Sequence, residues 1–485
     1  MSNGPVILAI DAGSSFLKMV VFDKTGAIVA RTRAAYQTRR PADGLAEQDP
    51  DGWIDLIAES VAALRRDGID TRQIAGIGLS GRGGMAIFLD AEGAVLVPCW
   101  IDRRSSSAGR TLANLLGADL DYQTRSLASK TYYLKINHPN AFARLARPLF
   151  LKDFLLYRLT GSVATDPSSV ISATGWPENV WNAVGFPVAH LAPIHDHTAI
   201  GGRLTDAMAD RLGLSTNLPV GVGGHDGACA NTGAGAIRPG QVCLTMGTQG
   251  VVRAIAAEPP THARERRVSP YPFLPGRWCC SGDLILAGAA PTLVARLFEP
   301  GSDASNVLLH ERFTDAARNV PPGARGVIYL PFPGGQISPE ARPEARAAFV
   351  GMSAETTTAD LYRAVLEGVA CAFRWVVERE RDVGLVLDDI RLTGGGAEND
   401  LWVQVMADVL NHPLTVVEPE EGARGAAMFL AVGLGWFRTP EEAADAWVKP
   451  ARRFEPSAHA SSYERVYHRF RCLTEAVYAA DHGDK

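Results

Sequence analysis

Apolar and polar stretches divide the start of the chain into short extended elements. The apolar residues 6–10 and 17–22 predict two buried strands, and the small residues of "DAGSS" predict a tight loop between them. The run "AIVARTR", which follows the turn "DKTG", predicts a third strand. Three short strands in quick succession are typical of an antiparallel meander.

A change in apolar spacing marks the first helix. In "WIDLIAESVAALRRDG", the side chains of Trp53, Ile57 and Val61 fall on one helical stripe, and Gly68 stands near the end. The runs "IAGIGLS" and "GMAIFLD" then predict further strands. This alternation continues through roughly the first 240 residues and is typical of an α/β domain.

A second series of strands and loops begins at "QVCLTMGTQGVV" and continues to "DIRLTGGG". Each series opens with an apolar strand that enters a small-residue loop, "AIDAGSS" in the first and "LTMGTQG" in the second. This pattern suits two related domains. The polar, proline-rich residues 253–275 predict a long surface loop, and a terminal helix is predicted from about residue 455.

Length and composition restrict the class of protein. A chain of 485 residues is too long for one ordinary core, so two large domains are expected. With 46% hydrophobic and 21% charged residues, the composition is that of a soluble globular protein. The net charge of −5 is spread without a basic block, which argues against a nucleic-acid partner. No apolar run approaches the ~20 residues that cross a bilayer, so no membrane partner is expected.

Cysteine usage and the first residues indicate the compartment. The seven cysteines include no C-x-x-C pair, which argues against structural disulfides and zinc and favours a reducing compartment. The N-terminus lacks a basic segment before its apolar run, and Asp11 interrupts that run, so a signal peptide is not expected. We therefore expect a cytoplasmic protein.

The position of Asp11 raises a question about its partner. The residue ends an apolar strand and is followed by small residues. An acid at a strand end costs nothing in water, but it is expensive when it is buried and unpaired. Solvent, a backbone donor or a cation must therefore meet the Asp11 carboxylate.

Residues 76–81, "GIGLSG", match the G-x-G-x-x-G pattern of dinucleotide-binding proteins. That use requires a helix directly after the glycines, because the helix N-terminus binds the pyrophosphate. The segment "RGGMAIFLD" follows instead and has the pattern of a strand. The match is therefore interpreted as coincidental, and an NAD-dependent dehydrogenase is disfavoured.

Three other glycine-rich segments offer groups suited to phosphate chemistry. In "GVGGHDGACANTGAGA", Asp226 stands at or near a helix N-terminus, either as a capping residue or as a carboxylate held ionised to act as a base. In "LTMGTQG", Gly247 and Thr248 offer donors to phosphate oxygens, with a plain β-turn as the alternative. In "LTGGGAEND", residues 394–396 either admit a flat ring or a phosphate, or form only a tight turn. Asn399 or Asp400 then caps the next helix.

The order of these motifs is more specific than any one of them. An Asp-containing hairpin, a Gly-Gly-x-Asp helix start, a Gly-Thr pair and a late Gly-Gly-x-x-x-Asn loop follow one another. This order resembles the FGGY carbohydrate kinases of the actin-like ATPase superfamily, and it is most similar to the xylulokinase-like members. The segments "GLAEQDPDGW", "WIDRR", "KDFLLYRLTG", "YRAVLEGVA" and "EGARGAAMFLAVGLG" also look like this family.

The resemblance implies an α/β fold with two RNase-H-like domains around a nucleotide cleft. The expected division is an N-terminal domain of residues 1–245 on the sugar and phosphate side, a C-terminal domain of residues 246–450 on the nucleotide side, and a helix within residues 451–485 that packs on the body. It also implies ATP and Mg²⁺ as cofactors and transfer of the γ-phosphoryl group to a sugar hydroxyl.

The resemblance assigns roles residue by residue. Asp226 matches the general base that accepts the proton of the attacking hydroxyl. Asp11 matches the carboxylate that orients the magnesium–phosphate assembly, so it is expected to be both catalytic and a metal ligand. The residues expected to bind the cofactor are Ser14, Ser15, Lys18, Gly247, Thr248, Gly288, Gly395 and Asn399.

Departures from the family concern mainly the sugar. Where xylulokinase-like members carry Met-His and glycerol kinases carry Arg-Glu, this chain has Gly83 and Gly84 after Arg82. Arg82 either grips hydroxyls or a carboxylate of the substrate, or pairs with an acid such as Asp102. The residues expected to bind the substrate are Arg82, Gly83, Gly84, Trp100, Asp102 and Asp226. On the nucleotide side, Gln249 stands where the family usually has a small hydroxyl residue, and Gln336 stands where it often has a glutamate. Asp153 and Asp166 lie in family-like segments, and we expect them to serve helix and turn structure.

The expected function is ATP-dependent phosphorylation of a small sugar, with a ketopentose such as xylulose as the leading substrate. The alternatives are a polyol kinase of the erythritol or xylitol type, a glycerol or gluconate kinase, and a nucleotide-binding regulator without catalysis. Asp226 argues against the regulator, because a pure switch needs no base. The expected partner is therefore a small-molecule sugar or polyol. Aromatics in the tail favour core packing, and a homodimer stays open.

Overall fold

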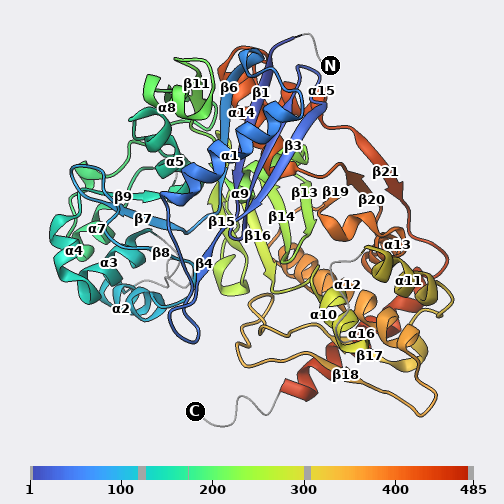
Figure 1. The fold of residues 1–485 in the computed structure, drawn as a ribbon. Helices are drawn as coiled ribbons and strands as arrows, with labels where there is room; N and C mark the ends of the chain where they lie inside the picture. Colours follow the sequence, from blue (N-terminus) through green and yellow to red (C-terminus); the bar gives the residue numbers. More distant parts are fainter. Residues whose placement is uncertain (1–3, 118–126, 173, 300–306, 479–485) are drawn as a thin grey trace. The chain divides into compact units, whose positions relative to one another are not determined.

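The chain folds into two compact units, and each unit contains its own mixed sheet. The computed structural model describes residues 4–117, 127–172, 174–299 and 307–478. Unit 1 comprises Met1–Gly235, Tyr271–Pro275 and Glu420–Val448, and unit 2 comprises Ala236–Pro270, Gly276–Pro419 and Lys449–Lys485. The chain therefore leaves unit 1 after Gly235 and later returns to it (Figure 1).

The sheet of unit 1 begins with the predicted meander. β1 (Val6–Ala12), β2 (Phe16–Phe22) and β3 (Ile28–Ala35) pair antiparallel, and β6 (Ile74–Gly81) joins β1 in parallel. The strand order is β10-β11-β6-β1-β2-β3, with β12 also paired to β6. The remaining strands of this sheet are β10 (Ile200–Arg203), β11 (Pro219–Gly221) and β12 (Gly224–His225).

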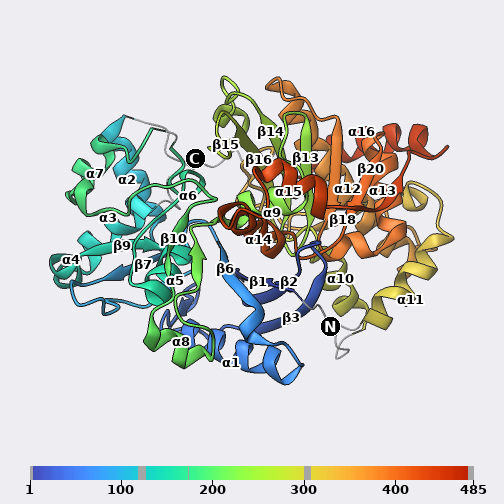
Figure 2. The same cartoon turned by 90° about the horizontal axis from the view of Figure 1, so that it is seen from above.

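Helices cover both faces of this sheet (Figure 2). α1 (Gly52–Arg66) buries its predicted apolar stripe and contacts β2 and β3. α9 (Asp226–Gly233) and α14 (Glu421–Gly433) pack together on the other side, where α14 also contacts β1 and β6. A Cβ atom at Gly425 would lie 1.9 Å from the carbonyl oxygen of Cys229, so only glycine permits this close helix packing.

Several of the other elements of unit 1 surround a second apolar cluster, which includes Trp100 and Trp181. As predicted, a strand and not a helix follows the "GIGLSG" segment of β6. The elements are β4 (Thr38–Arg39), β5 (Glu47–Gln48), β7 (Ala86–Leu89), β8 (Cys99–Trp100), β9 (Arg147–Phe150), α2 (Ser106–Leu116), α3 (Leu127–Asn137), α4 (Pro139–Arg144), α5 (Leu151–Thr160), α6 (Pro167–Val170), α7 (Glu178–Val184), α8 (Asp206–Leu212), α15 (Pro440–Trp447), η1 (Thr71–Gln73) and η3 (Val188–His190).

The second sheet repeats the strand order of the first. In the path β15-β16-β14-β13-β19-β20-β21, the run from β16 to β20 corresponds to β3-β2-β1-β6-β11, which bears out the two related series of strands in the sequence. β13 is antiparallel to β14 and parallel to β19, as β1 is to β2 and β6. The strands are β13 (Gln241–Met246), β14 (Gly250–Ala256), β15 (Ser269–Pro272), β16 (Trp278–Leu284), β19 (Asp389–Thr393), β20 (Leu414–Val417) and β21 (Pro450–Phe454).

Helices of unit 2 bury the second core against this sheet. The longest described helix of unit 2 is α12, which contacts β14, β16 and α13. A small hairpin of β17 and β18 also packs on α12 through β17. The elements are α10 (Ala290–Phe298), α11 (Val307–Arg318), α12 (Thr358–Asp382), α13 (Asp400–Leu410), α16 (Ala460–Tyr478), β17 (Ile328–Leu330), β18 (Ala348–Val350), η4 (Arg264–Arg266), η5 (Ala324–Gly326) and η6 (Gly395–Glu398).

The prediction of a long surface loop over residues 253–275 is wrong at both ends of that range, where the chain forms strands. Its first residues complete β14, and its last residues form β15 and a buried segment with Tyr271 and Phe273. Prolines and charges dominate this stretch, but alternate residues such as Ile255 are apolar and face the core. Composition therefore concealed two buried strands, and only the part between them is a loop.

The predicted terminal helix is α16, whose buried face lies in unit 2. Tyr463, Tyr467 and Phe470 are buried at helical spacing, so the core-packing interpretation of these aromatics is confirmed. The Tyr463 hydroxyl donates to Oε1 of Glu367 in α12 at 3.0 Å. Residues 479–485 of the expected terminal segment lie outside the described residues. Among the helices that the structure describes, none is both long and apolar enough to span a bilayer.

Candidate functional site

The Asp11 carboxylate lies at the end of β1, against two neighbouring elements of unit 1. Its Oδ1 accepts a hydrogen bond from the Ser80 hydroxyl of β6 at 2.7 Å. A Cβ atom at Gly422, in the first turn of α14, would lie 2.7 Å from Oδ2. Burial raises the pKa of Asp11 to about 6, although the Ser80 hydrogen bond and the charge of Lys18 oppose this. The hydrogen-bond partner that meets this acid is therefore a hydroxyl group, and the charge of Lys18 acts on it without a direct ion pair.

Lys18 lies opposite Asp11 in the register of β1 and β2. Its ammonium group is 3.1 Å from Oε2 of Glu420, the residue that precedes α14 and has a φ of 68°. Burial lowers the pKa of Lys18, but the charges of Glu420 and Asp11 outweigh it and raise that pKa overall. Lys18, the cation expected to reach the phosphates, is thus held beside Glu420, an acid that was not predicted from the sequence.

The loop between β1 and β2 is fixed through its backbone. The Ser15 carbonyl accepts from the Tyr36 N–H at 3.0 Å, and the Ser14 carbonyl accepts from the Gln48 amide at 2.9 Å. Ser15 is exposed and Ser14 is half-buried. Neither hydroxyl group donates to or accepts from another described residue, so both can serve a ligand.

Asp226 begins α9, but it does not cap that helix. The N-cap is His225, whose Nδ1 accepts from the N–H groups of Gly227 at 2.9 Å and Ala228 at 3.3 Å. Asp226 is therefore not the N-cap, although its Oδ1 also accepts from the Gly227 N–H of the first turn at 3.0 Å. Its Oδ1 accepts from the Gly83 N–H at 3.2 Å, and 45% of its side chain is exposed. A carboxylate at the positive end of a helix is held ionised, which suits a base.

A buried ionic cluster lies behind the start of α9. The ammonium group of Lys152 is 2.5 Å from Oδ1 of Asp153 and 2.9 Å from Oδ2 of Asp166, and His197 is 3.2 Å from Asp166. Asp166 caps α6, as its expected turn role requires, and Asp153 lies in the first turn of α5. In α6, the Ser168 hydroxyl accepts from the N–H of His225 at 3.4 Å. The cluster thus anchors the segment that carries Asp226.

The protonation of this cluster follows from its charges. Burial raises the pKa of Asp153 to about 6 despite Lys152. Burial would also raise the pKa of Asp166, but Lys152 and His197 outweigh it and hold that pKa well below its usual value. Burial disfavours the charged form of Lys152, but the two carboxylates raise its pKa overall. The cluster therefore keeps a buried ion pair between Lys152 and Asp166.

The proposed pairing of Arg82 with Asp102 is wrong. Asp102 accepts from Arg104 at 2.6 Å and from the Ala46 N–H at 2.8 Å, so its acceptors are already occupied. The Arg82 backbone N–H donates to the Ala12 carbonyl at 2.8 Å, which places the residue beside β1. Its guanidinium makes no ion pair or hydrogen bond with the rest of the described chain. Gly84, which follows in the turn, has a φ of 76° that glycine adopts at little cost.

Trp100 is only 2% exposed, and its ring stacks on Phe88 at 5.6 Å between ring centroids. Its carbonyl accepts from the ammonium group of Lys130 at 2.9 Å. Burial lowers the pKa of Lys130 to about 8, and the positive charges of Arg82 and Arg104 contribute in the same direction. Lys130 is a further charged residue of this region that sequence reasoning missed, because nothing in its local pattern distinguishes it from a surface lysine.

In unit 2, three glycine-rich loops meet at one end of the sheet. β13 and β19 are parallel, so the loops that follow Met246 and Thr393 leave the sheet at the same edge. A Cβ atom at Gly288 would lie 1.9 Å from the Gly247 carbonyl oxygen, and one at Gly394 would lie 2.7 Å from the backbone of Met246. The backbones therefore approach as closely as glycine allows. Of residues 394–396, only Gly395 has open space where a Cβ would be, which suits a ligand.

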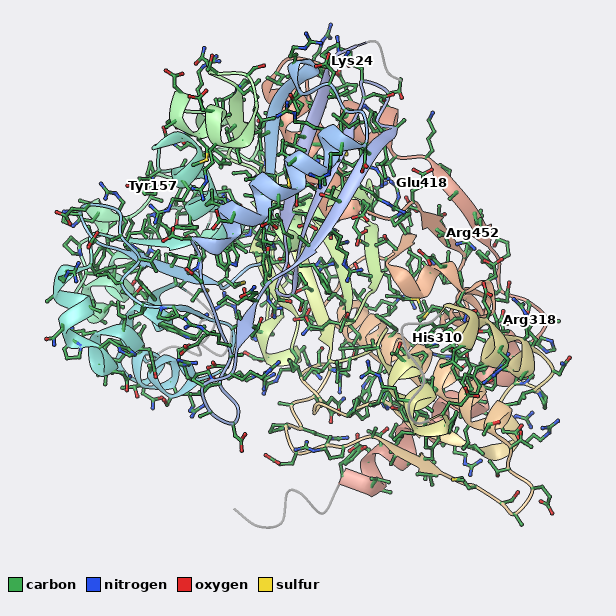
Figure 3. All side chains as sticks on the ribbon, viewed as in Figure 1. Lys24, Tyr157, His310, Arg318, Glu418 and Arg452 are labelled. Atoms are coloured by element: carbon green, nitrogen blue, oxygen red, sulfur yellow. The ribbon has the colours of Figure 1, made fainter. Side chains whose placement is uncertain are left out.

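The loop after β19 is held by side chains on both sides. Asn399 caps α13 by accepting from the Trp402 N–H at 3.2 Å, and its amide donates to Thr314 at 2.9 Å. Arg452 of β21, which is labelled in Figure 3, donates to the Ala397 carbonyl at 2.7 Å. The predicted cap at Asn399 is therefore confirmed, and its side chain is engaged within the protein. Thr248, in the loop after β13, is exposed.

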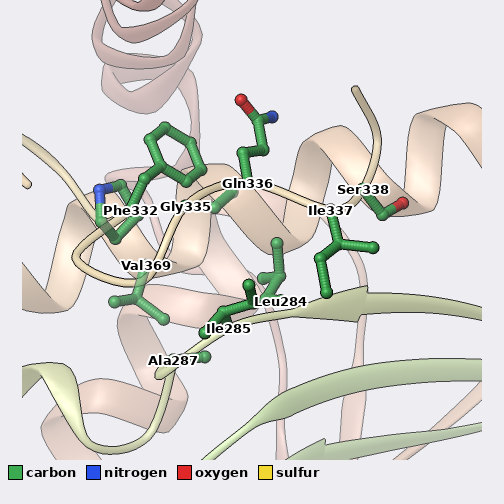
Figure 4. A pocket seen from close by; sticks show the side chains of 11 residues that line it. Leu284, Ile285, Ala287, Phe332, Gly335, Gln336, Ile337, Ser338 and Val369 are labelled. Carbon is green, nitrogen blue, oxygen red and sulfur yellow. The ribbon is translucent and has the colours of Figure 1, made fainter. Parts of the chain in front are cut away.

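A pocket in unit 2 adjoins the loop that carries Gly288 (Figure 4). Its lining is mainly apolar and includes Leu284, Phe332 and Val369. Gln336 is 3% exposed, and neither atom of its amide group has a hydrogen-bond partner among the described residues. The lining contains no basic side chain, so the pocket is not suited to phosphates.

Each unit presents polar groups of its own. Unit 1 presents the part-exposed carboxylate of Asp226 and the half-buried one of Asp11, and unit 2 presents backbone N–H groups in glycine-rich loops. No group of three or more His, Cys, Asp or Glu side chains within the described ranges can hold a metal ion. A hard cation with few protein ligands is compatible with Asp11, whereas a dedicated multi-ligand centre is not found in the part of the chain that the structure describes.

Two family models match the chain over most of its length. The N-terminal domain of the FGGY family of carbohydrate kinases matches residues 6–233, and the C-terminal domain of that family matches residues 242–434. The xylulose kinase of Bacillus subtilis (strain 168) is 28% identical over 472 residues, which cover 93% of each chain. The gluconokinase of Bacillus licheniformis is 25% identical over 459 residues, which cover 88% of this chain and 87% of that protein.

A solved structure agrees with these matches. The crystal structure of a xyloylose kinase from Brucella ovis has a TM-score of 0.87 and 26% sequence identity, and it covers 98% of this chain and 100% of that chain. The α/β fold class with two sheet-containing domains is thereby confirmed. The chain therefore belongs to the FGGY family of carbohydrate kinases, enzymes that phosphorylate small sugars.

Proposed function

We propose that this enzyme transfers the γ-phosphoryl group of ATP to a hydroxyl of a ketopentose such as xylulose, with Asp226 as the general base. The observation that carries the proposal is the Asp226 carboxylate, which is 45% exposed although the rest of its helix is buried. Its Oδ1 is oriented by the Gly83 N–H, and the helix cap is supplied by His225. The similarity to xylulose kinases supports the choice of a ketopentose.

Asp226 acts on the attacking hydroxyl of the sugar. Its carboxylate accepts the hydroxyl proton as the oxygen forms a bond to the γ-phosphorus, while the bond from that phosphorus to the leaving ADP oxygen breaks. The Gly83 N–H fixes the carboxylate in the orientation that receives the proton. Alignment matters more than basicity here, because phosphoryl transfer depends mainly on position and charge stabilisation.

Asp11 is the residue proposed to hold Mg²⁺. The donor set fits, because magnesium in kinases binds one or two carboxylates together with phosphate oxygens and water. The half-buried Asp11 carboxylate forms no ion pair with a cation of the described residues, and burial raises its pKa to about 6. When bound, Mg²⁺ neutralises charge on the phosphates and the leaving group. The Ser80 hydroxyl keeps Oδ1 in place for this role.

The other proposed roles belong to the loops. The hydroxyls of Ser14 and Ser15 bind phosphate oxygens on the unit 1 side, and Lys18 adds positive charge there. In unit 2, the backbone of Gly247 and the hydroxyl of Thr248 bind phosphates, and Gly395 admits the nucleotide. Gly288 acts indirectly, since it allows the loops to approach each other. Asn399 likewise positions the loop through its bonds to Trp402 and Thr314.

A sugar acid such as gluconate is the second candidate substrate. The guanidinium of Arg82 has no partner among the described residues, and it lies next to Gly83, which contacts Asp226. Five N–H donors in a planar group suit a carboxylate well. Similarity to gluconokinases supports this candidate too. Arg82→Ala should therefore reduce activity on a sugar acid more than on a ketopentose.

The proposal is tested by measuring ADP release from Mg-ATP with ketopentoses, polyols, glycerol and sugar acids. Wild type should turn over one class, and Asp226→Asn should lose about 10²- to 10⁴-fold in kcat, the usual contribution of a positioned base. Asp206→Asn is the matched control, because Asp206 also begins a helix of unit 1, but it is exposed and its helix contacts α1.

The outcomes separate the parts of the proposal. Turnover of xylulose that is lost in Asp226→Asn and kept in Asp206→Asn supports both the substrate and the base. Turnover of gluconate alone replaces the ketopentose with the second candidate. Retention of most turnover in Asp226→Asn would overturn the assignment of the base.

A further inference from the structure

Glu420 has a backbone conformation that is unusual for its residue type. The residue directly precedes α14, and its φ of 68° lies in the left-handed region, which is unfavourable for residues other than glycine. Its side chain accepts no capping hydrogen bond from the described first turn of that helix. Backbone strain persists only where the surroundings fix it, and it occurs mainly at functional sites. The contacts of the Glu420 side chain therefore indicate why the strain is kept.

The Glu420 carboxylate lies between two cations of the sheet of unit 1. Its Oε2 is 3.1 Å from Nζ of Lys18 in β2, and its Oε1 is 3.8 Å from Nη1 of Arg31 in β3. The Glu420 side chain is 15% exposed, whereas that of Lys18 is 37% exposed. The carboxylate is thus largely enclosed, but Lys18 keeps surface that a ligand can reach.

Lys18 has a second acid beside it. Asp11 is its direct partner in the antiparallel register of β1 and β2, and such partners carry their side chains on the same face of the sheet. Opposite charges in these positions attract each other. Among the described residues, however, the ammonium group of Lys18 forms an ion pair with Glu420 and none with Asp11. Glu420 therefore competes with Asp11 for this cation, and the folded chain favours Glu420.

An ion pair between Lys18 and Asp11 would occupy two groups of the proposed site at once. Asp11 is the residue proposed to hold Mg²⁺, and Lys18 is proposed to add positive charge for the phosphates. An ammonium group has three N–H donors, so a contact with one carboxylate oxygen of Glu420 leaves donors for phosphate oxygens. A lysine that is already held also loses less side-chain entropy when a ligand binds.

We propose that Glu420 is a positioning residue, which holds the ammonium group of Lys18 apart from Asp11 and thereby keeps it available to the phosphates of ATP. The inference rests on the proposed function, because it assigns the phosphates of ATP to this part of unit 1. A Cβ atom at Gly422, two residues further along, would lie 2.7 Å from Oδ2 of Asp11. The start of α14 therefore contacts both members of the pair that it keeps apart.

The test measures the affinity for ATP by calorimetric titration, with magnesium chelated and without sugar. Removal of a negative charge near the phosphates would by itself tighten the binding of ATP. Glu420→Gln should instead weaken it by about ten-fold, near the lower end of the contribution of one hydrogen bond to a charged group. Glu59→Gln, at an exposed position of α1 in the same unit, is the control for the change of charge and should match wild type.

Two backgrounds show whether Glu420 acts through Lys18 and Asp11. In Lys18→Met, the further change Glu420→Gln should leave the ATP affinity unchanged, because the cation that Glu420 positions is missing. In Asp11→Asn, the same change should also have little effect, since the competing carboxylate is gone. A loss that persists at full size in either background would overturn the inference, as would wild-type affinity in Glu420→Gln.

Glu420→Gly separates positioning from folding. Glycine adopts a φ of 68° at little cost, and a partly exposed ion pair contributes little to stability, so the melting temperature should not fall. The affinity for ATP should nevertheless fall as it does in Glu420→Gln, and wild-type affinity would overturn the inference. Asn217→Gly is the matched control, because Asn217 is an exposed residue of unit 1 with a φ of 59°, and it should keep the wild-type affinity.

The titrations also distinguish this inference from the proposed function. If wild type binds ATP but phosphorylates no sugar, the proposed function fails, and the variants still decide the role of Glu420. If wild type does not bind ATP, the proposed function and this inference fail together.

Discussion

At the scale of single residues, the site depends on what stands next to each carboxylate. Asp11 and Asp226 have the same side chain, but one is half-buried and bonded to Ser80 at a strand end and the other is nearly half-exposed at a helix start. Sequence reasoning identified both acids. Ser80 and Glu420 were not identified, because they are far from Asp11 and Lys18 in the sequence. Only the fold brings Ser80 into contact with Asp11 and Glu420 into contact with Lys18.

Gly422→Ala tests how closely Asp11 must be held. The new Cβ would lie 2.7 Å from Oδ2, so the carboxylate or the helix must move. A displacement of this kind in an active site costs up to about 10²-fold in rate, and overpacking costs about 1–3 kcal/mol of stability. We expect a kcat at least about ten-fold lower, measured by ADP release with the preferred sugar.

Gly52→Ala provides the comparison for Gly422→Ala. Gly52 also lies in the first turn of a helix of unit 1, but a Cβ there would meet its nearest neighbour only at 4.0 Å. This variant should keep the wild-type rate. Equal rates for Gly422→Ala and wild type would show that the contact with Asp11 does not position it.

At the scale of elements, strands and helices were more predictable than their ends. The meander of β1 to β3, the stripe of α1 and the strand after "GIGLSG" follow from local periodicity, and the structure confirms them. The loop expected at residues 253–275 failed because β14 and β15 depend on pairing with partners far along the chain. The ionic cluster around Lys152 could not be predicted either, since its members come from separate segments.

Two glycines of the unit 2 loops should respond differently to the same substitution. A Cβ at Gly288 would clash with the Gly247 carbonyl at 1.9 Å, whereas a Cβ at Gly395 would meet open space. We expect Gly288→Ala to lower the melting temperature and to weaken ATP binding. Gly395→Ala should leave the melting temperature unchanged and weaken only ATP binding, because the methyl group occupies the space proposed for the nucleotide.

Thermal denaturation and calorimetric titration of ATP measure these two effects separately. A normal melting temperature for Gly288→Ala would contradict the proposed closeness of the loops. Unchanged ATP affinity in Gly395→Ala would remove that glycine from the nucleotide site.

At the scale of the whole molecule, one buried acid makes stability depend on pH. Glu380 in α12 is fully buried, and its carboxyl group forms no ion pair with another described residue. Burial raises the pKa of Glu380 well above its ordinary value of 4.5. The folded chain therefore holds a proton that the unfolded chain loses above about pH 4.5. This group's contribution to the free energy of unfolding must fall as pH rises from there to the raised pKa.

Glu380→Gln removes this pH-dependent contribution. The melting temperature of the variant should be near that of wild type at about pH 5 and should exceed it increasingly toward pH 8, with a slope of at most about 1.4 kcal/mol per pH unit in the free energy of unfolding. Glu311→Gln, at an exposed position of α11, should follow wild type throughout. Parallel curves for Glu380→Gln and wild type would mean that Glu380 is ionised in the folded state.

The route of the chain through unit 1 has a consequence for its synthesis. α14 completes the core beside α9 and β1, and its Gly422 lies against Asp11, yet it begins only at Glu421. The N-terminal strands therefore leave the ribosome long before the helix that covers them. Until then, one face of the first sheet has to remain soluble without its permanent cover, while all of unit 2 up to Pro419 is made. The proposed magnesium ligand is thus synthesised long before the helix that completes its surroundings.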